Sequence, residues 1–128
     1  MAASPAFAST LKTANGVLSV ANTGRDGTGT VVTVFSAGTN GSIVESITVQ
    51  ATATTTAGMV RVFVHDGTNF RLYDEIAVTA ATPSATVKAF RAQNTYTNRP
   101  IKLPNGYSLR FSTEKAEAFN VVVEGGDL

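Results

Sequence analysis

The chain of 128 residues contains no cysteine and a single histidine, His65. The lack of cysteine excludes disulfide bonds, thiolate metal sites and a cysteine nucleophile. A single histidine excludes a metal centre built from several histidines. Ten basic and nine acidic residues nearly cancel, which excludes the strongly basic surface of a typical nucleic-acid-binding domain. We therefore expect neither a cofactor nor a nucleic-acid partner.

Long apolar runs are also missing, and none reaches the length of a membrane span. The first residues, Met1–Pro5, lack the charged start and the apolar stretch of a secretory signal. We expect a protein that is not exported by that route and that has no membrane partner. The length fits one domain.

What the chain has in abundance is threonine, alanine and valine, which together make up about two-fifths of it. β-Branched residues pack well on pleated sheets and lose rotamer freedom in helices. Eleven glycines, several of them in Asn-Gly or Asp-Gly pairs, supply turns. The composition predicts an all-β protein.

The patterned part begins at residue 30, and we divide the chain into residues 1–29 and a β-sandwich domain of residues 30–128. Alternation and turn residues predict about eight short strands, the clearest over Thr30–Ser36, Ser42–Thr54, Met59–Val64, Phe70–Val78, Thr86–Ala92, Tyr107–Ser112 and Phe119–Val123. In the second of these, Ile43, Ile47, Val49 and Ala51 are expected on one face. The stretches Asn94–Pro104 and Gly125–Leu128 are predicted to be irregular.

Residues 1–29 are predicted to form an irregular N-terminal arm or a pair of short edge strands. Asn15-Gly16 is a candidate hairpin turn. Gly24–Gly29 is rich in glycine, but it lacks the lysine of a phosphate-binding loop and no helical pattern follows it. An ordinary loop is the favoured interpretation of this segment.

The best hairpin joins Met59–Val64 to Phe70–Val78. A three-residue loop, His65–Gly67, would pair Val62 with Phe70 and Val60 with Leu72, so that apolar residues oppose each other. The loop also places Gly67 where a left-handed conformation is wanted.

Short strands separated by frequent turns predict two antiparallel sheets packed face to face, a β-sandwich of the jelly-roll kind. A closed barrel is the alternative. The strand order does not follow from these patterns.

Two pairs of neighbouring residues, His65–Asp66 and Asp74–Glu75, are candidates for catalytic groups. His65 and Asp66 lie at a predicted hairpin tip, with no strained serine motif in the chain, so a turn role is favoured. Asp74 and Glu75 are neighbours on a strand and should face opposite sides, whereas carboxylate catalysis needs two groups that converge. Asp74 interrupts an inward row, where Arg110 or a backbone amide is the expected partner. The sequence therefore predicts no catalytic site.

One sheet face is a candidate contact surface. It carries the alternating residues of the predicted hairpin that point away from the core, namely Met59, Arg61, Phe63, Arg71 and Tyr73. Arg, Tyr, Phe and Met are enriched at interface cores, and an exposed apolar face needs an explanation. A protein interface is the favoured interpretation. The alternatives are ordinary surface, a second-layer core, and a nucleic-acid or glycan contact.

Two stretches of the chain are similar to a known class of proteins. These are Ala53–Phe63 followed by Asp66–Asn69, and Arg110–Glu117 with the ending Gly125–Leu128. In these segments the chain resembles small structural proteins of tailed-bacteriophage virions, some of which are decoration or cement proteins on the outer capsid surface. The likeness is one of overall pattern from about residue 7 onward.

The resemblance implies a non-enzymatic virion protein with no active site. It implies a location on the capsid surface after assembly in the host cytoplasm, a major capsid protein as partner, and a homo-oligomer, a trimer by expectation. The alternative function is a carbohydrate-binding or adhesin module on a phage tail or fibre.

Overall fold

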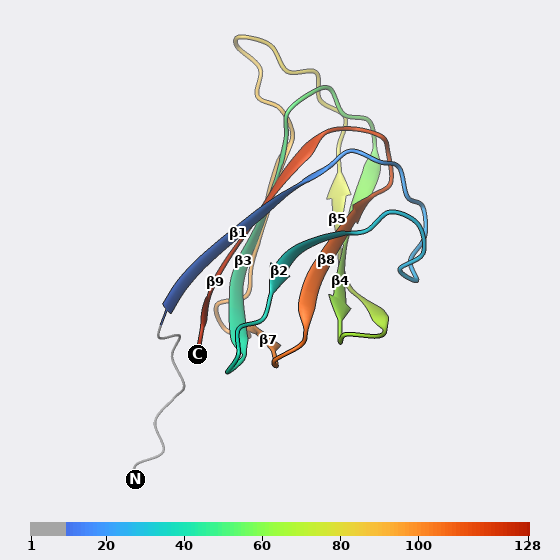
Figure 1. Ribbon diagram of the computed structural model, residues 1–128. Coiled ribbons are helices and arrows are strands. Elements are labelled where there is room, and N and C mark those ends of the chain that lie inside the picture. Colours follow the sequence, from blue (N-terminus) through green and yellow to red (C-terminus); the bar gives the residue numbers. More distant parts are fainter. Residues whose placement is uncertain (1–9) are drawn as a thin grey trace.

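The computed structural model describes residues 10–128. This part of the chain contains nine β-strands and no helix. Figure 1 shows the strands in two layers. Their bounds are β1 Thr10–Leu18, β2 Val32–Ser36, β3 Ser42–Ala51, β4 Gly58–His65, β5 Phe70–Val78, β6 Arg91–Thr95, β7 Ile101–Leu103, β8 Ser108–Thr113 and β9 Phe119–Asp127.

The strands form two antiparallel sheets. Sheet A has the order β1-β9-β3-β6, and the short β7 also pairs with β3. Sheet B has the order β2-β8-β4-β5. The pairing is nested, because β1 lies beside β9, β2 beside β8, β3 beside β6 and β7, and β4 beside β5. The predicted all-β architecture of two antiparallel sheets is confirmed.

Large apolar side chains from both sheets fill the space between them. Phe119 and Ile47 of sheet A and Phe35, Leu109 and Phe111 of sheet B are fully or almost fully buried. Burial on this scale stabilises the fold by roughly 1.5–3 kcal/mol for each large side chain. The core therefore needs no covalent cross-link.

Strand β1 lies at the edge of sheet A, within the segment predicted to be an irregular arm or a pair of short edge strands. It pairs with β9 over nine consecutive positions, from Thr10 opposite Asp127 to Leu18 opposite Phe119. The predicted turn at Asn15-Gly16 is wrong, since both residues lie within this strand. Glycine suits position 16 because a Cβ there would lie only 3.0 Å from Val34 Cγ2, a tight contact. Residues 1–9, the first part of the expected arm, lie outside the described residues.

The alternation in β3 is interrupted at Glu45. The register with β9 shifts between Val44 and Ser46, as happens at a β-bulge. Val44 is fully buried, whereas Ile43 is only half-buried. The prediction that Ile43 shares the inward face of Ile47 and Val49 is therefore wrong.

The hairpin of β4 and β5 has a four-residue loop, not the predicted three. His65 pairs with Phe70, and Val60 pairs with Ile76. The Asp66 carboxylate favours the longer loop because its Oδ1 accepts hydrogen bonds from the backbone N–H groups of Thr68 and Asn69, at 2.9 and 2.7 Å. A register shift beside Tyr73 then returns Ile76 to the core face. The expected left-handed conformation of Gly67 is confirmed at φ 101°.

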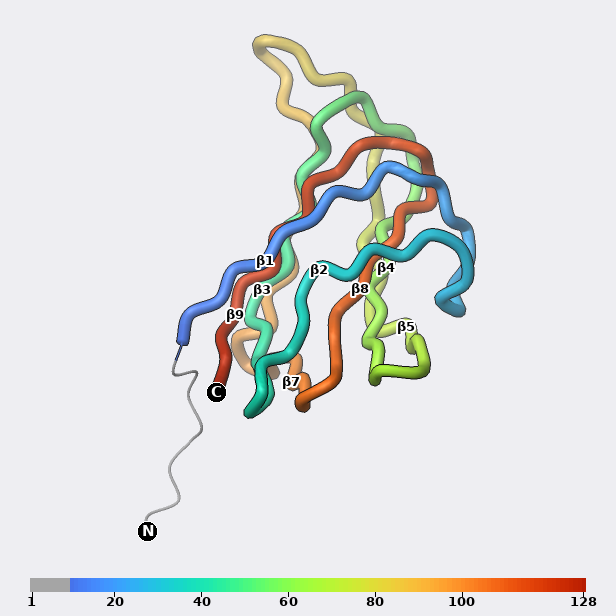
Figure 2. Tube along the Cα trace, in the orientation of Figure 1, coloured from blue at the N-terminus to red at the C-terminus, as the bar shows by residue number. Residues whose placement is uncertain are grey.

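Three other predicted boundaries need correction. Strand β6 begins at Arg91, after most of the expected 86–92 strand. The stretch 94–104, predicted to be irregular, contains β7, and β9 continues to Asp127 through the expected loose tail. The tube in Figure 2 shows the loop of residues 79–90 extending beyond one end of the two sheets.

Substitution of Gly125 by alanine should destabilise sheet A. A Cβ on Gly125 would lie 2.0 Å from the backbone oxygen of Ile43, so the two central strands would have to separate. We expect a loss of about 1–3 kcal/mol or more in the free energy of unfolding, measured in urea. Gly58→Ala is the control, because the tightest contact of its Cβ would be 3.2 Å, with the flexible side chain of Lys115. Equal stability of the two variants would contradict the pairing of β3 with β9.

Candidate functional site

The five predicted interface residues do not form one exposed patch. Arg61 is 2% exposed and Phe63 is completely buried. Met59 is half-buried, whereas Arg71 and Tyr73 are exposed. Arg71 pairs with Val64, one residue away from the Phe63–Leu72 pair, so it lies on the opposite side of the sheet from Phe63. The prediction of a single interface formed by these five side chains is wrong.

Arg61 lies beneath residues 19–31, which we call the covering loop, and Phe63 is on the same side of sheet B, with its ring 6.1 Å from that of Phe70. The loop joins β1 to β2 and lies against the outer side of sheet B. Asn22 fixes its shape by donating from Nδ2 to the backbone oxygens of Thr28 and Thr30, at 2.8 and 2.9 Å. Gly27, at φ 88°, packs directly against Phe70, and a Cβ there would lie 2.3 Å from the ring. The glycine-rich segment is therefore a structural cover.

The Arg61 guanidinium joins this loop to sheet B. It donates to Glu75 Oε2 at 3.0 Å, to Glu114 Oε1 at 2.7 Å and to the backbone oxygen of Asn22 at 3.1 Å. Arg25, on the covering loop, donates to the same Glu75 oxygen at 2.8 Å. Two carboxylates and a carbonyl thus satisfy a charge that would be costly to bury alone.

These contacts perturb the Glu75 carboxylate. The hydrogen bond from Arg25, reinforced by the hydrogen bond from Arg61, lowers the pKa of Glu75 below its ordinary value. Hydrogen bonds to the charged form of a carboxylate favour that form. Glu75 is therefore held ionised as a structural anion.

His65 and Asp66 are also used by the local structure. His65 is buried, not exposed as predicted for a hairpin tip; its Nδ1 accepts the Gly67 N–H at 3.1 Å, and its ring lies 4.5 Å from that of Phe70. The bonds from Asn69 and Thr68 lower the pKa of Asp66. Both side chains are bound within the hairpin, in agreement with the turn role favoured from the sequence.

Asp74 and Glu75 turn to opposite sides, as expected for neighbours on a strand. Asp74 Oδ2 accepts hydrogen bonds from Tyr96 Oη at 2.8 Å and from Asn94 Nδ2 at 3.1 Å, and Oδ1 accepts the Glu75 N–H. Of the two partners expected for Asp74, the backbone amide is confirmed by the Glu75 N–H, whereas Arg110 donates to Ser108 Oγ instead. Burial and the bond to Asp74 raise the pKa of Tyr96. Asp74 thus connects the edges of the two sheets.

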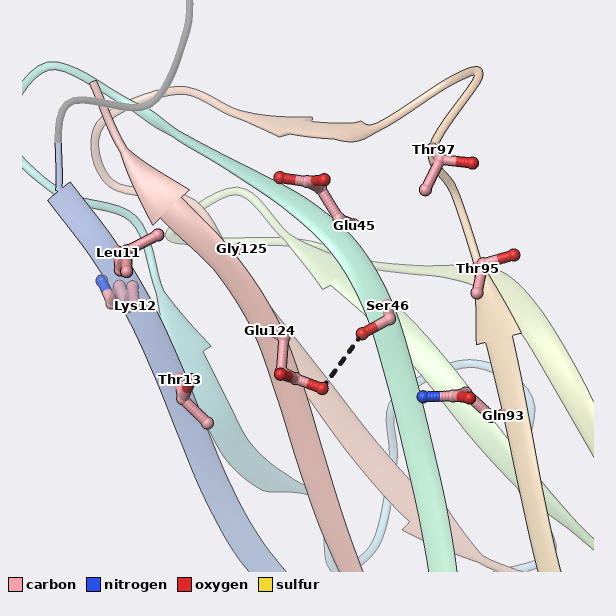
Figure 3. A pocket seen from close by; sticks show the side chains of 10 residues that line it. All are labelled: Leu11, Lys12, Thr13, Glu45, Ser46, Gln93, Thr95, Thr97, Glu124 and Gly125. Atoms are coloured by element: carbon pink, nitrogen blue, oxygen red, sulfur yellow. Dashed lines mark hydrogen bonds between the residues drawn. The ribbon is translucent and has the colours of Figure 1, made fainter.

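The other outer face, that of sheet A, has a depression of about 460 Å³. Figure 3 shows side chains from β1, β9, β3 and β6 on this face, including Glu45, Ser46, Gln93 and Glu124. The depression is lined by Leu11, Lys12, Thr13, Glu45, Ser46, Gln93, Thr95, Thr97, Glu124 and Gly125. Sequence reasoning missed this site because its residues meet only when β1 and β6 flank β9 and β3. Alternation on single strands carries no signal of that strand order.

Among residues 10–128 there is no group of three or more histidine, aspartate or glutamate side chains placed to hold a metal ion. No helix long and apolar enough to cross a membrane occurs in the same part of the chain.

The chain matches no family model, no curated protein and no solved structure.

Replacement of Arg61 by alanine should destabilise the protein strongly. It would remove the hydrogen bonds of a buried guanidinium to Glu75 and Glu114, whose side chains are 30% and 26% exposed, and should cost about 1–3 kcal/mol. Arg25→Ala removes an exposed partner of the same carboxylate and should cost less than about 1 kcal/mol. Urea unfolding of the two variants measures both values. Similar small losses would show that the Arg61 contacts do not hold the covering loop.

Stability should also depend on pH through the same carboxylate. Because the folded-state pKa of Glu75 is lowered, its contribution is present above the unfolded-state pKa and is lost as pH falls through the folded-state pKa. We expect stability to decrease below about pH 4.5. Glu75→Gln should remove part of that decrease in urea unfolding between pH 7 and pH 3. An unchanged pH profile would contradict the assignment.

Proposed function

We propose that this protein is a non-enzymatic virion structural protein, a decoration or cement protein that binds the outer surface of a bacteriophage capsid. The observation that carries the proposal is the outer face of sheet A, which spans four strands and, within residues 10–128, carries exposed side chains on each of them. The covering loop lies against the outer side of sheet B, where Arg61, Glu75 and Glu114 bond to one another and to the loop. A broad open face on a compact sandwich suits contact with another protein.

The finer fold supports this proposal. Nested pairing of first with last strands, and of second with second-last, is what a rolled-up antiparallel hairpin produces. This arrangement supports the jelly-roll form, a fold used by viral capsid and lectin domains. Fold alone does not determine function, so the virion assignment also rests on the resemblance of Ala53–Phe63 and Arg110–Glu117 to virion proteins.

The proposed mechanism is bridging. A cement protein contacts several capsid subunits, so opening of the lattice must break those contacts together. A homotrimer at threefold or quasi-threefold positions would match the symmetry of such a lattice. The major capsid protein is the proposed partner, and the capsid surface the proposed location.

A specific contact favours the glycan-binding alternative on a tail or fibre. The ring of Tyr73, which is 48% exposed, lies 6.3 Å from that of Tyr96. Asp74 and Asn94 lie beside this pair. An exposed aromatic ring beside polar groups suits the stacking and hydrogen bonding of a sugar.

The genomic neighbourhood and a binding assay test the proposal. We expect DNA flanking the gene to encode a major capsid protein, a portal and a head protease. The purified chain should then co-sediment with capsids assembled from that neighbouring capsid protein. Capsids that bind no protein, together with virions that lack it, would refute the cement role. Neighbouring fibre genes and binding on a glycan array that is lost in Tyr73→Ala would establish the alternative.

A further inference from the structure

We propose that the outer face of sheet A docks a partner protein by receiving an arginine side chain in the depression between β1, β9, β3 and β6. The inference deepens the proposed function and rests on it for the identity of that partner. The proposed occupant of the depression is an arginine side chain of another protein.

Most of this face is uncharged, as contact surfaces usually are near their centre. Side chains that point outward lie in matching rows across the four strands, because the strands are in register. The two central rows combine Thr13, Glu124, Ser46 and Thr95 with Asn15, Val122, Thr48 and Gln93. Threonine, serine and amide side chains dominate these rows.

Charge within the depression has one sign. Glu45 and Glu124 are both exposed, and neither forms an ion pair with any of residues 10–128. Glu124 accepts only a long bond of 3.4 Å from Ser46 Oγ. Lys12 lines the depression, but its Nζ turns to the inner side, where it donates to Ser36 and Asp127. Within residues 10–128 the two carboxylates therefore have no ion-pair partner, and Lys102 of β7 lies opposite Ile43, outside the depression.

The bulge in β3 is responsible for part of this arrangement. The register shift between Val44 and Ser46 allows Val44 to face the core and Ser46 to face outward. Glu45 is the additional residue, and its carboxylate is added to the outer face (Figure 3). In a regular strand, the neighbours Glu45 and Ser46 would point to opposite faces of the sheet.

A guanidinium group suits these surroundings. It carries five N–H donors and no acceptor, and the lining offers carboxylate oxygens together with the hydroxyls of Thr13, Thr95 and Thr97. Leu11, which is 94% exposed at the rim, offers an apolar surface for the aliphatic part of the side chain. Arginine fits better than lysine because a planar fork pairs with a carboxylate through two hydrogen bonds.

Other occupants have less support. The described residues contain no group of three acidic or histidine side chains for a metal ion. No aromatic ring lines the depression on which a sugar could stack. A second copy of the chain is an outcome that the experiment must separate.

Nuclear magnetic resonance of the full ¹⁵N-labelled chain tests the proposal. The probes are the peptides acetyl-Leu-Arg-Leu-amide and acetyl-Leu-citrulline-Leu-amide, which differ in charge but closely match in shape. We expect saturable shifts at residues of β1, β3, β6 and β9 around the depression, with binding of the citrulline peptide about tenfold weaker. Equal affinity of the two peptides, or shifts elsewhere on the surface, would overturn the inference.

Matched variants separate the site from net charge. Glu45→Gln with Glu124→Gln should weaken arginine-peptide binding about tenfold. Ala80→Lys with Ala85→Lys causes the same change in charge at exposed positions of the 79–90 loop and should leave binding unchanged. Equal weakening by both pairs would overturn the inference, as would shifts at this face that depend on protein concentration without peptide, since those indicate a second copy.

The same variants distinguish this inference from the proposed function. Peptide binding without any binding to capsids refutes the cement role and leaves the arginine site intact. Capsid binding that the Glu45→Gln, Glu124→Gln variant does not reduce refutes the docking site and leaves the cement role intact.

Discussion

The contacts of the buried Arg61 guanidinium determine how the outer side of sheet B is covered. A charge with 2% exposure must be neutralised where it lies, and here one carboxylate from β5, another from the β8–β9 connection and a carbonyl of the covering loop do so. The loop is thereby held against the outer side of sheet B, where Gly27 packs on Phe70. The outer face of sheet A, by contrast, carries exposed side chains on each of its four strands, among them Thr13, Glu124, Glu45 and Thr95.

Local patterns in the sequence were sufficient for the class of fold and for most strands. The predicted strands Met59–Val64, Tyr107–Ser112 and Phe119–Val123 supply fully buried side chains, among them Val60, Val62, Phe111 and Val121. Gly67 marked a turn that the structure contains. These signals are local, because side-chain alternation and turn conformation depend on a few neighbouring residues.

What the sequence could not provide was long-range pairing. The covering loop contacts Arg61 from about forty residues away along the chain, so an outward position was mistaken for an exposed one. The bulges beside Glu45 and Tyr73 shift the faces of β3 and β5 by one residue. The depression on sheet A needs four strands in a particular order, and no motif encodes that order.

The pairing of β1 with β9 also has a mechanical consequence. Thr10 lies opposite Asp127, and the two strands run antiparallel from that point to Leu18 and Phe119 (Figure 1). A force that pulls Thr10 and Asp127 apart would act across the ladder at one end, so its hydrogen bonds would break one after another. A load applied at Leu18 and Asp127 would instead act along the strands and stress the ladder as a whole. Resistance to tension would therefore depend on where a neighbouring molecule holds the protein.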